Sequence, residues 1–540
     1  MEIIDRIRDM GNETLQTFHL TQEAVEKLEE YKQLPRMELD HLNPKGDYID
    51  EINKRNKIDE KLFQGDIYLD ELQGKLIFDE LREELEGGNR TKRQAIRDKE
   101  GVRLWNNHTV HYFFTMTLNE DARRAFLRGA KMWTENTCIK FKEDPYAQVQ
   151  NLLVVQAKSG CWSNLGKLGS LQHISLADGC ETSSIAAHEI GHTLGFYHTM
   201  SRHDRDKYVI VDFENIEEKW RSQFAWQSEL ENDNFDLAYD YGSIMHYRAS
   251  DAAINRQQPT LMPYDKDYRE TLGSPFVSFI DVLMLNKLYG CDKLCERKQK
   301  KSGSEKRINK CRNGGYPHPL KCSKCVCPDG YAGDRCNERP RGSPKECGYT
   351  YDASTEWKNF TDRLGDPTVY RPMENYTKCY YWIQSPENTE IEVELVSFSK
   401  YHAMEGCPNA GVEIKTNENQ QLTGYRFCSP SAAGTKLRSY TNLVPIITWN
   451  KVSESRAVLR YRHVPKDESR STTSERPQAL QKTRPPTTFA PPTTVQKQNE
   501  CKDHPECPVH IANGFCYREG ITYEQKKTYC PRGCHLCGSR

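Results

Sequence analysis

The stretch from His188 to His198 concentrates the residue types that bind metals and transfer protons. His188 and His192 are four positions apart, so on a helix their imidazoles project from the same face and can meet one ion. Gly195 can adopt the left-handed conformation that ends a helix, and the chain then returns with His198 as a third ligand. Three neutral imidazoles leave one position of a zinc ion open for water, which is typical of catalytic rather than structural zinc.

Glu189 follows the first histidine and can reach that open position. It can take a proton from the water and later pass it to a leaving amine, so the pattern predicts hydrolysis of peptide bonds. The four-residue spacing alone is moderate evidence for a catalytic zinc site, whereas the eleven-residue form with the glycine and the third histidine is far more specific. The alternative is a buried histidine cluster without catalytic activity.

The elements that position these residues belong to a region from Gln94 to Cys291, which we expect to form an α+β domain. Alternation and apolar runs predict strands over 109–114, 152–156 and 171–176, and apolar residues at helical spacing predict a helix over 120–133. The metal-binding helix has small and apolar residues before His188, which suit a buried position. Ser183 or Ser184 is expected to cap its start.

Size and composition limit the remaining possibilities. The 540 residues exceed what one hydrophobic core supports, so we expect several domains. The net charge of −1 provides no field that would attract nucleic acid, and no apolar run approaches the length of a membrane span. We therefore expect neither a nucleic-acid partner nor a membrane-spanning segment.

The chain contains 20 cysteines, none of them before Cys138. An even number in compact clusters predicts a disulfide framework formed in an oxidising compartment, and hence a secreted protein. Cytosolic zinc ribbons are the rival interpretation, but matched pairs of C-x2-C are missing. Met1 to Glu30 contains no apolar leader, so either the signal peptide is missing from this sequence or export is unconventional, and we expect the first. Candidate N-glycosylation sites stand at Asn107, Asn359 and Asn375.

Changes in composition divide the chain further. Residues 1–93 are charged, cysteine-free and helix-biased, and they end in a basic run at Arg93. We interpret them as a propeptide that a convertase-type protease removes between Arg93 and Gln94. After the α+β domain come a cysteine-rich module at 292–337, a β-rich region at 347–465 that predicts a β-sandwich, a Ser/Thr/Pro-rich linker at 466–500, and another cysteine-rich module at 501–537.

The zinc motif, its continuation to Asp206 and the segment Ser243–Tyr247 resemble the astacin family of metzincin proteases. The resemblance implies that Met245 forms the turn beneath the zinc. It also implies that Tyr247 is an additional ligand, able to stabilise the oxyanion of the transition state. Phe63-Gln-Gly-Asp66 resembles the family's inhibitory motif, in which the aspartate binds zinc and displaces the catalytic water.

The later modules resemble an EGF-like domain, a CUB domain and a ShK-toxin-like (ShKT) domain, in the order found in nematode astacins. The resemblance implies ten disulfides: Cys138–Cys291, Cys161–Cys180, Cys295–Cys322, Cys311–Cys325, Cys327–Cys336, Cys347–Cys379, Cys407–Cys428, Cys501–Cys537, Cys507–Cys530 and Cys516–Cys534.

Four departures from the family's patterns limit what it implies. Thr199 replaces the glutamate that binds the new N-terminus in many members. Pro275 stands in the segment where members that prefer an acidic residue after the cut bond carry an arginine. Ala410-Gly411 replaces the aspartate of calcium-binding CUB domains, and Glu524-Gln525 replaces the Lys-Tyr pair of channel-blocking toxins.

The sequence therefore predicts a multidomain, secreted zinc metalloendopeptidase that is made as a zymogen and binds one zinc ion per subunit. Its expected substrates are extracellular proteins, with those of cuticle or matrix as candidates. The alternative is an inert binding protein that acts through its CUB and ShKT modules. The intact set of ligands, with Glu189 and Tyr247, favours the enzyme.

Overall fold

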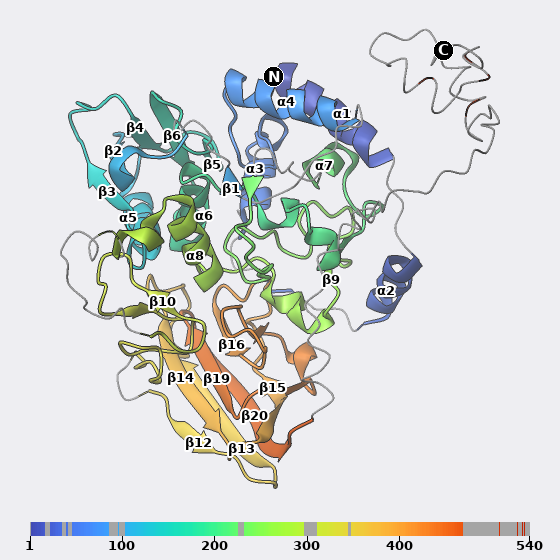
Figure 1. Ribbon diagram of the computed structural model, residues 1–540, viewed down its shortest axis with the longest axis vertical. Coiled ribbons are helices and arrows are strands. Elements are labelled where there is room, and N and C mark those ends of the chain that lie inside the picture. The colour runs from blue at the N-terminus through green and yellow to red at the C-terminus, as the bar shows by residue number, and fades with distance from the viewer. Residues whose placement is uncertain are drawn as a thin grey trace, which may run out of the picture. The chain divides into compact units, whose positions relative to one another are not determined.

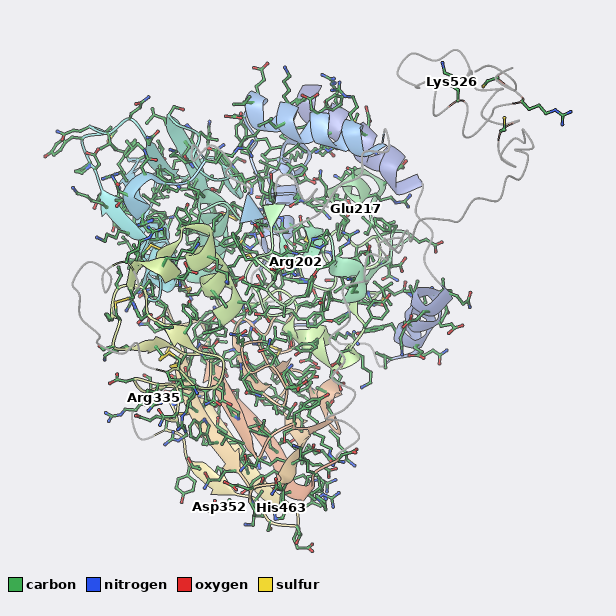
Figure 2. All side chains as sticks on the ribbon, in the orientation of Figure 1. Arg202, Glu217, Arg335, Asp352, His463 and Lys526 are labelled. Atoms are coloured by element: carbon green, nitrogen blue, oxygen red, sulfur yellow. A yellow bond between two sulfur atoms is a disulfide. The ribbon has the colours of Figure 1, made fainter. Side chains whose placement is uncertain are left out.

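The structure is a computed structural model, and the residues that it describes are 2–16, 22–34, 39–40, 46–85, 95–96, 103–224, 232–295, 297, 310–343, 347–467, 507, 526, 532 and 534. The chain divides into two compact units, residues 1–471 and 472–540 (Figure 1). Figure 2 shows the side chains of the described residues. Apart from its first two residues, the expected linker lies outside them, and so does nearly all of the expected ShKT module. Within the described residues, no helix has the length and apolar character needed to cross a membrane.

A five-stranded sheet forms the scaffold of the expected α+β domain. Its strand order is β3-β2-β4-β6-β5, in which β5 is antiparallel to β6 and forms one edge, while the other neighbours are parallel. The strands are β2 (Thr109–Phe114), β3 (Lys140–Glu143), β4 (Leu152–Gln156), β5 (Cys161–Ser163) and β6 (Leu171–Leu176). The three strands predicted from the sequence are confirmed.

Helix α5 (Glu120–Thr134) covers this sheet with an apolar face, and the predicted helix over 120–133 is confirmed. Ala122, Phe126 and Trp133 are buried in the core of the domain. Asn119 caps the helix, because its side-chain oxygen accepts a hydrogen bond from the backbone N–H of Ala122 at 2.8 Å.

Helix α6 (Ser183–Thr193) packs directly against α5. A β-carbon added at Gly129 of α5 would lie 2.7 Å from the backbone nitrogen of Ala187, so only glycine allows this approach. The indole of Trp133 donates to the carbonyl of Ala187 at 2.8 Å and fixes the contact. Together, α5 and the sheet hold α6 in a single orientation.

The prediction that Ser183 or Ser184 caps α6 was wrong. The capping residue is Thr182, whose backbone is extended and whose hydroxyl accepts from the N–H of Ile185 at 3.3 Å. Both serines lie inside the first turn of the helix.

The rest of the peptidase region has little regular structure among its described residues. Helix α8 (Phe279–Leu288) begins with a capping box between Ser278 and Asp281. The other elements are α7 (Glu218–Arg221), β1 (Ala95–Ile96) paired with β8 (Asn232–Asp233), and β7 (Val209–Val211) paired with β9 (Leu261–Pro263). Short 3-10 helices occupy Asn106–His108, Thr199–Ser201, Arg205–Lys207, Ser222–Phe224, Lys266–Thr271 and Cys291–Lys293.

The described residues of the N-terminal segment (1–93) are largely helical, as the composition of this segment predicted. It contains α1 (Glu2–Gln16), α2 (Gln22–Gln33), α3 (Ile49–Arg55), a 3-10 turn (Asp59–Lys61) and α4 (Glu71–Leu85). Helices α1 and α4 lie side by side (Figure 1). Ile4, Ile7 and Ile77 form one apolar cluster with Phe63 and with Tyr197 of the peptidase region. The segment is therefore folded onto the peptidase region.

Residues 347–467 form the predicted β-sandwich. One sheet has the order β12-β14-β19-β16-β17 and the other β13-β20-β15-β18. The strands are β12 (Thr350–Asp352), β13 (Lys358–Gly365), β14 (Thr377–Gln384), β15 (Thr389–Phe398), β16 (Ala410–Ile414), β17 (Tyr425–Phe427), β18 (Lys436–Arg438), β19 (Leu443–Asn450) and β20 (Glu454–Pro465), with a 3-10 turn at Pro430–Ala432. A small disulfide-bonded module with β10 (Tyr316–Pro317) and β11 (Cys325–Val326) precedes it.

The β-sandwich is attached to the peptidase region by a buried interface. Phe276 of the peptidase region belongs to the apolar core of the sandwich. The buried carboxylate of Glu270 accepts hydrogen bonds from the backbone N–H groups of Cys428 (2.7 Å) and Ser429 (3.1 Å). Unpaired polar groups are costly when buried, so these bonds tie the two regions together.

Candidate active site

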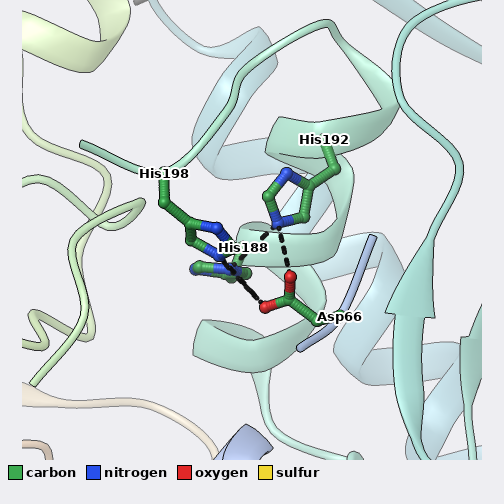
Figure 3. Close-up of side chains that lie close together, drawn as sticks. All are labelled: Asp66, His188, His192 and His198. Atoms are coloured by element: carbon green, nitrogen blue, oxygen red, sulfur yellow. Dashed lines mark hydrogen bonds and ion pairs between the residues drawn. The ribbon is translucent and has the colours of Figure 1, made fainter. Parts of the chain in front are cut away.

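The three histidines of the sequence motif converge, as their spacing predicted. His188 and His192 lie on one face of α6, and Gly195 has a φ of +105°, which ends the helix and returns the chain to His198. The Nε2 atom of His188 is 3.2 Å from that of His192 and 3.1 Å from that of His198 (Figure 3).

Each of the two helical imidazoles is oriented by an interaction of its other nitrogen. Nδ1 of His188 is 2.7 Å from the carbonyl oxygen of Ile244, and Nδ1 of His192 is 2.7 Å from that of Phe196. With a proton on Nδ1, each ring donates to its carbonyl and directs the lone pair of Nε2 towards the centre. Such second contacts are typical of histidines that bind metals.

Asp66 of the N-terminal segment completes this centre. Its Oδ2 atom is 3.2 Å from Nε2 of His188 and 3.1 Å from Nε2 of His198, and its Oδ1 atom is 3.4 Å from Nε2 of His192. The approach of all three rings to one carboxylate is visible in Figure 3.

The donor set fits a zinc ion. Ligands around tetrahedral zinc with bonds of about 2.0–2.1 Å are separated by about 3.3 Å, close to the separations seen here. Burial lowers the pKa of His192 and lowers that of His198 to about 3, so both rings are neutral and can donate lone pairs.

Glu189 is fully buried beside the histidines. Neither carboxylate oxygen has a hydrogen-bond partner among the described residues. Burial, reinforced by the charge of Asp66, raises its pKa well above the ordinary value. A buried carboxylate with no structural partner, next to a metal centre, has the properties expected of a group that exchanges protons.

Met245 and Tyr247 lie beneath and beside the histidines. A β-carbon at Gly191 would collide with the sulfur of Met245, so the turn packs directly under α6. The hydroxyl of Tyr247 donates to the backbone carbonyl of Gln64, and its ring centre is 4.5 Å from that of His198. The tyrosine hydroxyl is thus bonded to the N-terminal segment in this structure.

Gln64 is a site residue whose role the sequence did not reveal, although it stands in the quoted motif. Its side-chain oxygen is 2.9 Å from Nδ1 of His198, and its amide nitrogen donates to the hydroxyl of Ser201 at 2.8 Å. Its backbone N–H donates to the side chain of Gln223. Gln64 therefore orients the third histidine from outside the peptidase region.

Asn53 of α3 was also missed, and no sequence pattern marks it. Its amide nitrogen donates to the carbonyls of Gly65 (2.9 Å) and Cys161 (2.7 Å), while its oxygen accepts from the N–H of Cys161 at 2.8 Å. It thereby joins the loop around Asp66 to the edge strand β5.

The loop also pairs with β5 directly. The N–H of Ser163 donates to the backbone carbonyl of Asp66 at 3.0 Å, and the N–H of Tyr68 donates to that of Ser163 at 2.8 Å. This pairing is parallel. The N-terminal segment therefore covers both the metal centre and the free edge of the sheet.

The remaining predicted residues lie elsewhere. Arg93 and Gln94 are outside the described residues, and Asn107, Asn359 and Asn375 are all exposed. The structure joins Cys138–Cys291, Cys161–Cys180, Cys295–Cys322, Cys311–Cys325, Cys327–Cys336, Cys347–Cys379 and Cys407–Cys428. The other three expected pairs involve cysteines outside the described residues.

Comparisons with known proteins agree with this site. Residues 97–290 match the model of the peptidase family described as Astacin. Zinc metalloproteinase nas-31 of Caenorhabditis elegans is 35% identical over 521 residues, covering 96% of this chain and 78% of the relative. Zinc metalloproteinase dpy-31 of the same organism is 31% identical over 448 residues, covering 80% and 72%.

Among solved structures, High choriolytic enzyme 1, a hatching enzyme zinc-protease of the medaka fish Oryzias latipes, is 28% identical. It covers 36% of this chain and 98% of its own, with a TM-score of 0.34. From the match to the family model and the extent of the match to nas-31, the chain belongs to the astacin family of peptidases and is a zinc metalloendopeptidase.

Proposed function

We propose that this chain is the latent precursor of a secreted endopeptidase that cuts extracellular proteins, with those of cuticle or matrix as candidate substrates. The observation that carries the proposal is the position of Asp66, whose carboxylate lies among the three metal-binding nitrogens. A water molecule that attacks a peptide bond needs this position, so the N-terminal segment and a substrate exclude one another.

After the segment leaves, each remaining group has a chemical role. Zinc bound by His188, His192 and His198 supplies Lewis acidity and lowers the pKa of a water. Glu189 accepts the proton of the attacking water and delivers it to the leaving nitrogen. The hydroxyl of Tyr247, freed from Gln64, donates a hydrogen bond to the oxyanion of the transition state.

The free edge of β5 can bind the substrate backbone. Ser163 already forms two backbone hydrogen bonds with the N-terminal segment, at 3.0 and 2.8 Å. The same N–H and carbonyl become available when that segment is removed. An extended peptide that adds to this edge gains main-chain hydrogen bonds whatever its side chains.

Activation follows from this arrangement. We assign residues 1–93 as the inhibitory propeptide and residues 94–291 as the peptidase domain, with cleavage between Arg93 and Gln94 by a convertase-type protease. Asp66 acts as the zinc switch of the zymogen. Met245 forms the supporting turn.

We assign the accessory regions from the resemblance of their sequence patterns to known modules. Residues 292–337 form an EGF-like domain, 347–465 a CUB domain, 466–500 a flexible linker and 501–537 a ShKT domain, whose expected pairs are Cys501–Cys537, Cys507–Cys530 and Cys516–Cys534. The solvent-accessible positions of the sequons support glycosylation at Asn107, Asn359 and Asn375. Their glycans and the disulfides agree with secretion.

Substitution of Glu189 by alanine tests the catalytic assignment. The full-length chain, cleaved after Arg93, should contain one zinc per chain by atomic spectroscopy and should hydrolyse a protein substrate. Glu189→Ala should keep the zinc and lose turnover by a factor of at least about 100. Glu120→Ala, an equivalent change on the exposed start of α5, is the matched control. Near wild-type turnover by Glu189→Ala would refute the assignment, whereas a cleaved wild-type chain without any turnover would favour the inert binding protein.

A further inference from the structure

A loop of the β-sandwich, residues 401–405, contacts the N-terminal segment. Asp40 of the segment and Ala403 of this loop exchange two hydrogen bonds. The backbone N–H of Asp40 donates to the carbonyl of Ala403 at 2.7 Å, and the N–H of Ala403 donates to the carboxylate of Asp40 at 2.9 Å. The hydroxyl of Tyr48 donates to the backbone carbonyl of Glu405 at 3.2 Å. The segment is therefore bonded to the β-sandwich at two separate points.

The loop is held in place by its own neighbours, so it offers the segment a preformed surface. The backbone N–H of Cys407 donates to the carbonyl of Met404 at 3.0 Å, and a disulfide joins Cys407 to Cys428. Gly406 has a φ of +75°, and a β-carbon there would collide with the carbonyl oxygen of Gly273 in the peptidase region. The loop is thus in tight contact with the peptidase region next to the place where the segment binds.

A buried arginine joins the same three regions. The guanidinium of Arg248, whose side chain is only 6% exposed, forms ion pairs with Asp50 of the segment and with Asp251 of the peptidase region. Oε2 of Glu405 is 3.7 Å from its Nη1 atom, and the ring centre of Tyr48 is 3.5 Å from its Cζ atom. Departure of the segment takes two of these neighbours away from a buried charge. This loss slows the departure, because a buried charge is costly to leave with fewer partners.

Hydrolysis of the bond between Arg93 and Gln94 breaks none of these contacts. Asp40 and Tyr48 lie far upstream of the cut, and so does Asp66 at the metal centre. The cleaved segment therefore keeps its contacts with the metal centre and with the β-sandwich. It must dissociate from both before a substrate can enter.

We propose that loop 401–405 of the β-sandwich is a second holding site for the N-terminal segment, which keeps the segment bound after the cut and slows the appearance of activity. The inference rests on the proposed peptidase function and adds a step to its activation. Cleavage makes release possible, and release then frees the metal centre. The β-sandwich thereby sets the delay between processing and activity.

The test cuts the full-length chain after Arg93 and follows hydrolysis of a fluorogenic peptide with time. The wild type should show a lag that outlasts the cut, which gel electrophoresis measures separately. The double variant Asp40→Ala, Tyr48→Phe loses a hydrogen bond to a charged group and a neutral one, so its lag should be at least about fivefold shorter. Glu30→Gln, a change on the exposed face of α2, is the matched control and should keep the wild-type lag.

All of these substitutions lie in the segment that is removed, so the separated mature enzymes are identical in sequence. Their kcat/KM should be equal, which excludes a folding defect as the cause of a shorter lag. Activity that appears in the wild type as fast as the cut, or equal lags in the wild type and the double variant, would overturn the proposal. Absence of turnover by the separated mature enzyme would instead contradict the proposed function.

Hydrogen exchange measured by mass spectrometry provides a readout that does not require turnover. Peptides that cover residues 401–405 should exchange slowly in the precursor and in the cut chain, and faster once the segment has been separated. The reason is that the N–H of Ala403 then loses the carboxylate of Asp40. Exchange that rises as soon as the chain is cut, or that does not change when the segment is removed, would overturn the holding site whether or not the enzyme turns over.

Discussion

The latency of the precursor depends on Asp66, and Asp66→Asn tests that dependence with little change in shape. Among the described residues, the carboxylate makes its close polar contacts only with the three histidine Nε2 atoms, at 3.1–3.4 Å. Oδ1 has no hydrogen-bond partner there. The substitution therefore removes the charged contact with the metal centre and leaves the backbone pairing with β5 intact.

The magnitude follows from the burial of this contact. Loss of one partner of a buried charge pair costs about 3–5 kcal/mol, which corresponds to a factor of about 100 to 5,000 in the population of the closed state. The rest of the loop stays anchored, because Gln64 keeps its interactions with His198 and Ser201 and each is worth about 0.5–1.5 kcal/mol. The uncleaved variant should hence leak activity at least about 100-fold above the wild-type background, yet remain below the cleaved enzyme.

A fluorogenic peptide assay on the uncleaved, full-length chain measures the leak. Arg93→Ala is introduced into every precursor so that processing does not contribute. Asp70→Asn is the matched control, because Asp70 lies in the same segment and its side chain accepts a local hydrogen bond from the N–H of Gln73 at 2.7 Å. The switch is refuted if the uncleaved Asp66→Asn precursor is as inactive as the wild-type precursor. This outcome counts only if the Asp66→Asn chain with Arg93 retained folds and becomes active after cleavage.

Three further predictions concern stability and the new N-terminus. Burial raises the pKa of Glu270 to about 7, from 4.5 in the unfolded chain. The folded state then binds the extra proton between these values, so this group's contribution to the free energy of unfolding falls by about 3 kcal/mol as pH rises from about 4.5 to 7. Glu270→Gln should weaken the dependence of the melting temperature on pH between pH 5 and 8, and an unchanged dependence would contradict this. Gly129→Val should lower the melting temperature and weaken zinc retention in a chelator titration, because a β-carbon would strike α6, at a cost of about 1–3 kcal/mol. The hydroxyl of Thr199 already donates to that of Ser243 at 2.9 Å, and it carries no charge that could pair with a new N-terminal ammonium. Purified forms that start near Gln94 should therefore differ little in activity or melting temperature. A large loss of stability on adding two residues ahead of Gln94 would show that the N-terminus is locked in place.

The metal centre could be predicted largely from the sequence because its geometry is local. The spacing from His188 to His198 and the glycine between them determine which face each ring occupies, whatever the surrounding fold. Asp66 is 122 residues away from His188 in the sequence, so no local rule connects them. Only the resemblance of its short motif indicated a role.

The residues that were missed act through long-range contacts. Asn53 lies in an ordinary charged helix, and its role emerges only because α3 packs beside Cys161 of the edge strand. Periodicity predicts which face of a helix is buried, but it does not predict which backbone groups a buried amide meets. The same reason explains the error at the start of α6, where three successive hydroxyl residues could each have been the cap.

The prediction of separate modules missed more of the structure than the errors at single residues did. Composition and cysteine spacing indicate where one module ends and the next begins, and they favour a picture of independent domains. Glu270 nevertheless accepts a hydrogen bond from the β-sandwich, and Phe276 packs in the core of the sandwich. Glu405 of the sandwich forms an ion pair with Arg248 of the peptidase region. A module whose removal exposes Phe276 and leaves a buried carboxylate unpaired is part of the peptidase in energetic terms. Truncation to residues 94–291 would therefore disturb the stability of the enzyme, and the full-length chain is the form in which the site should be studied.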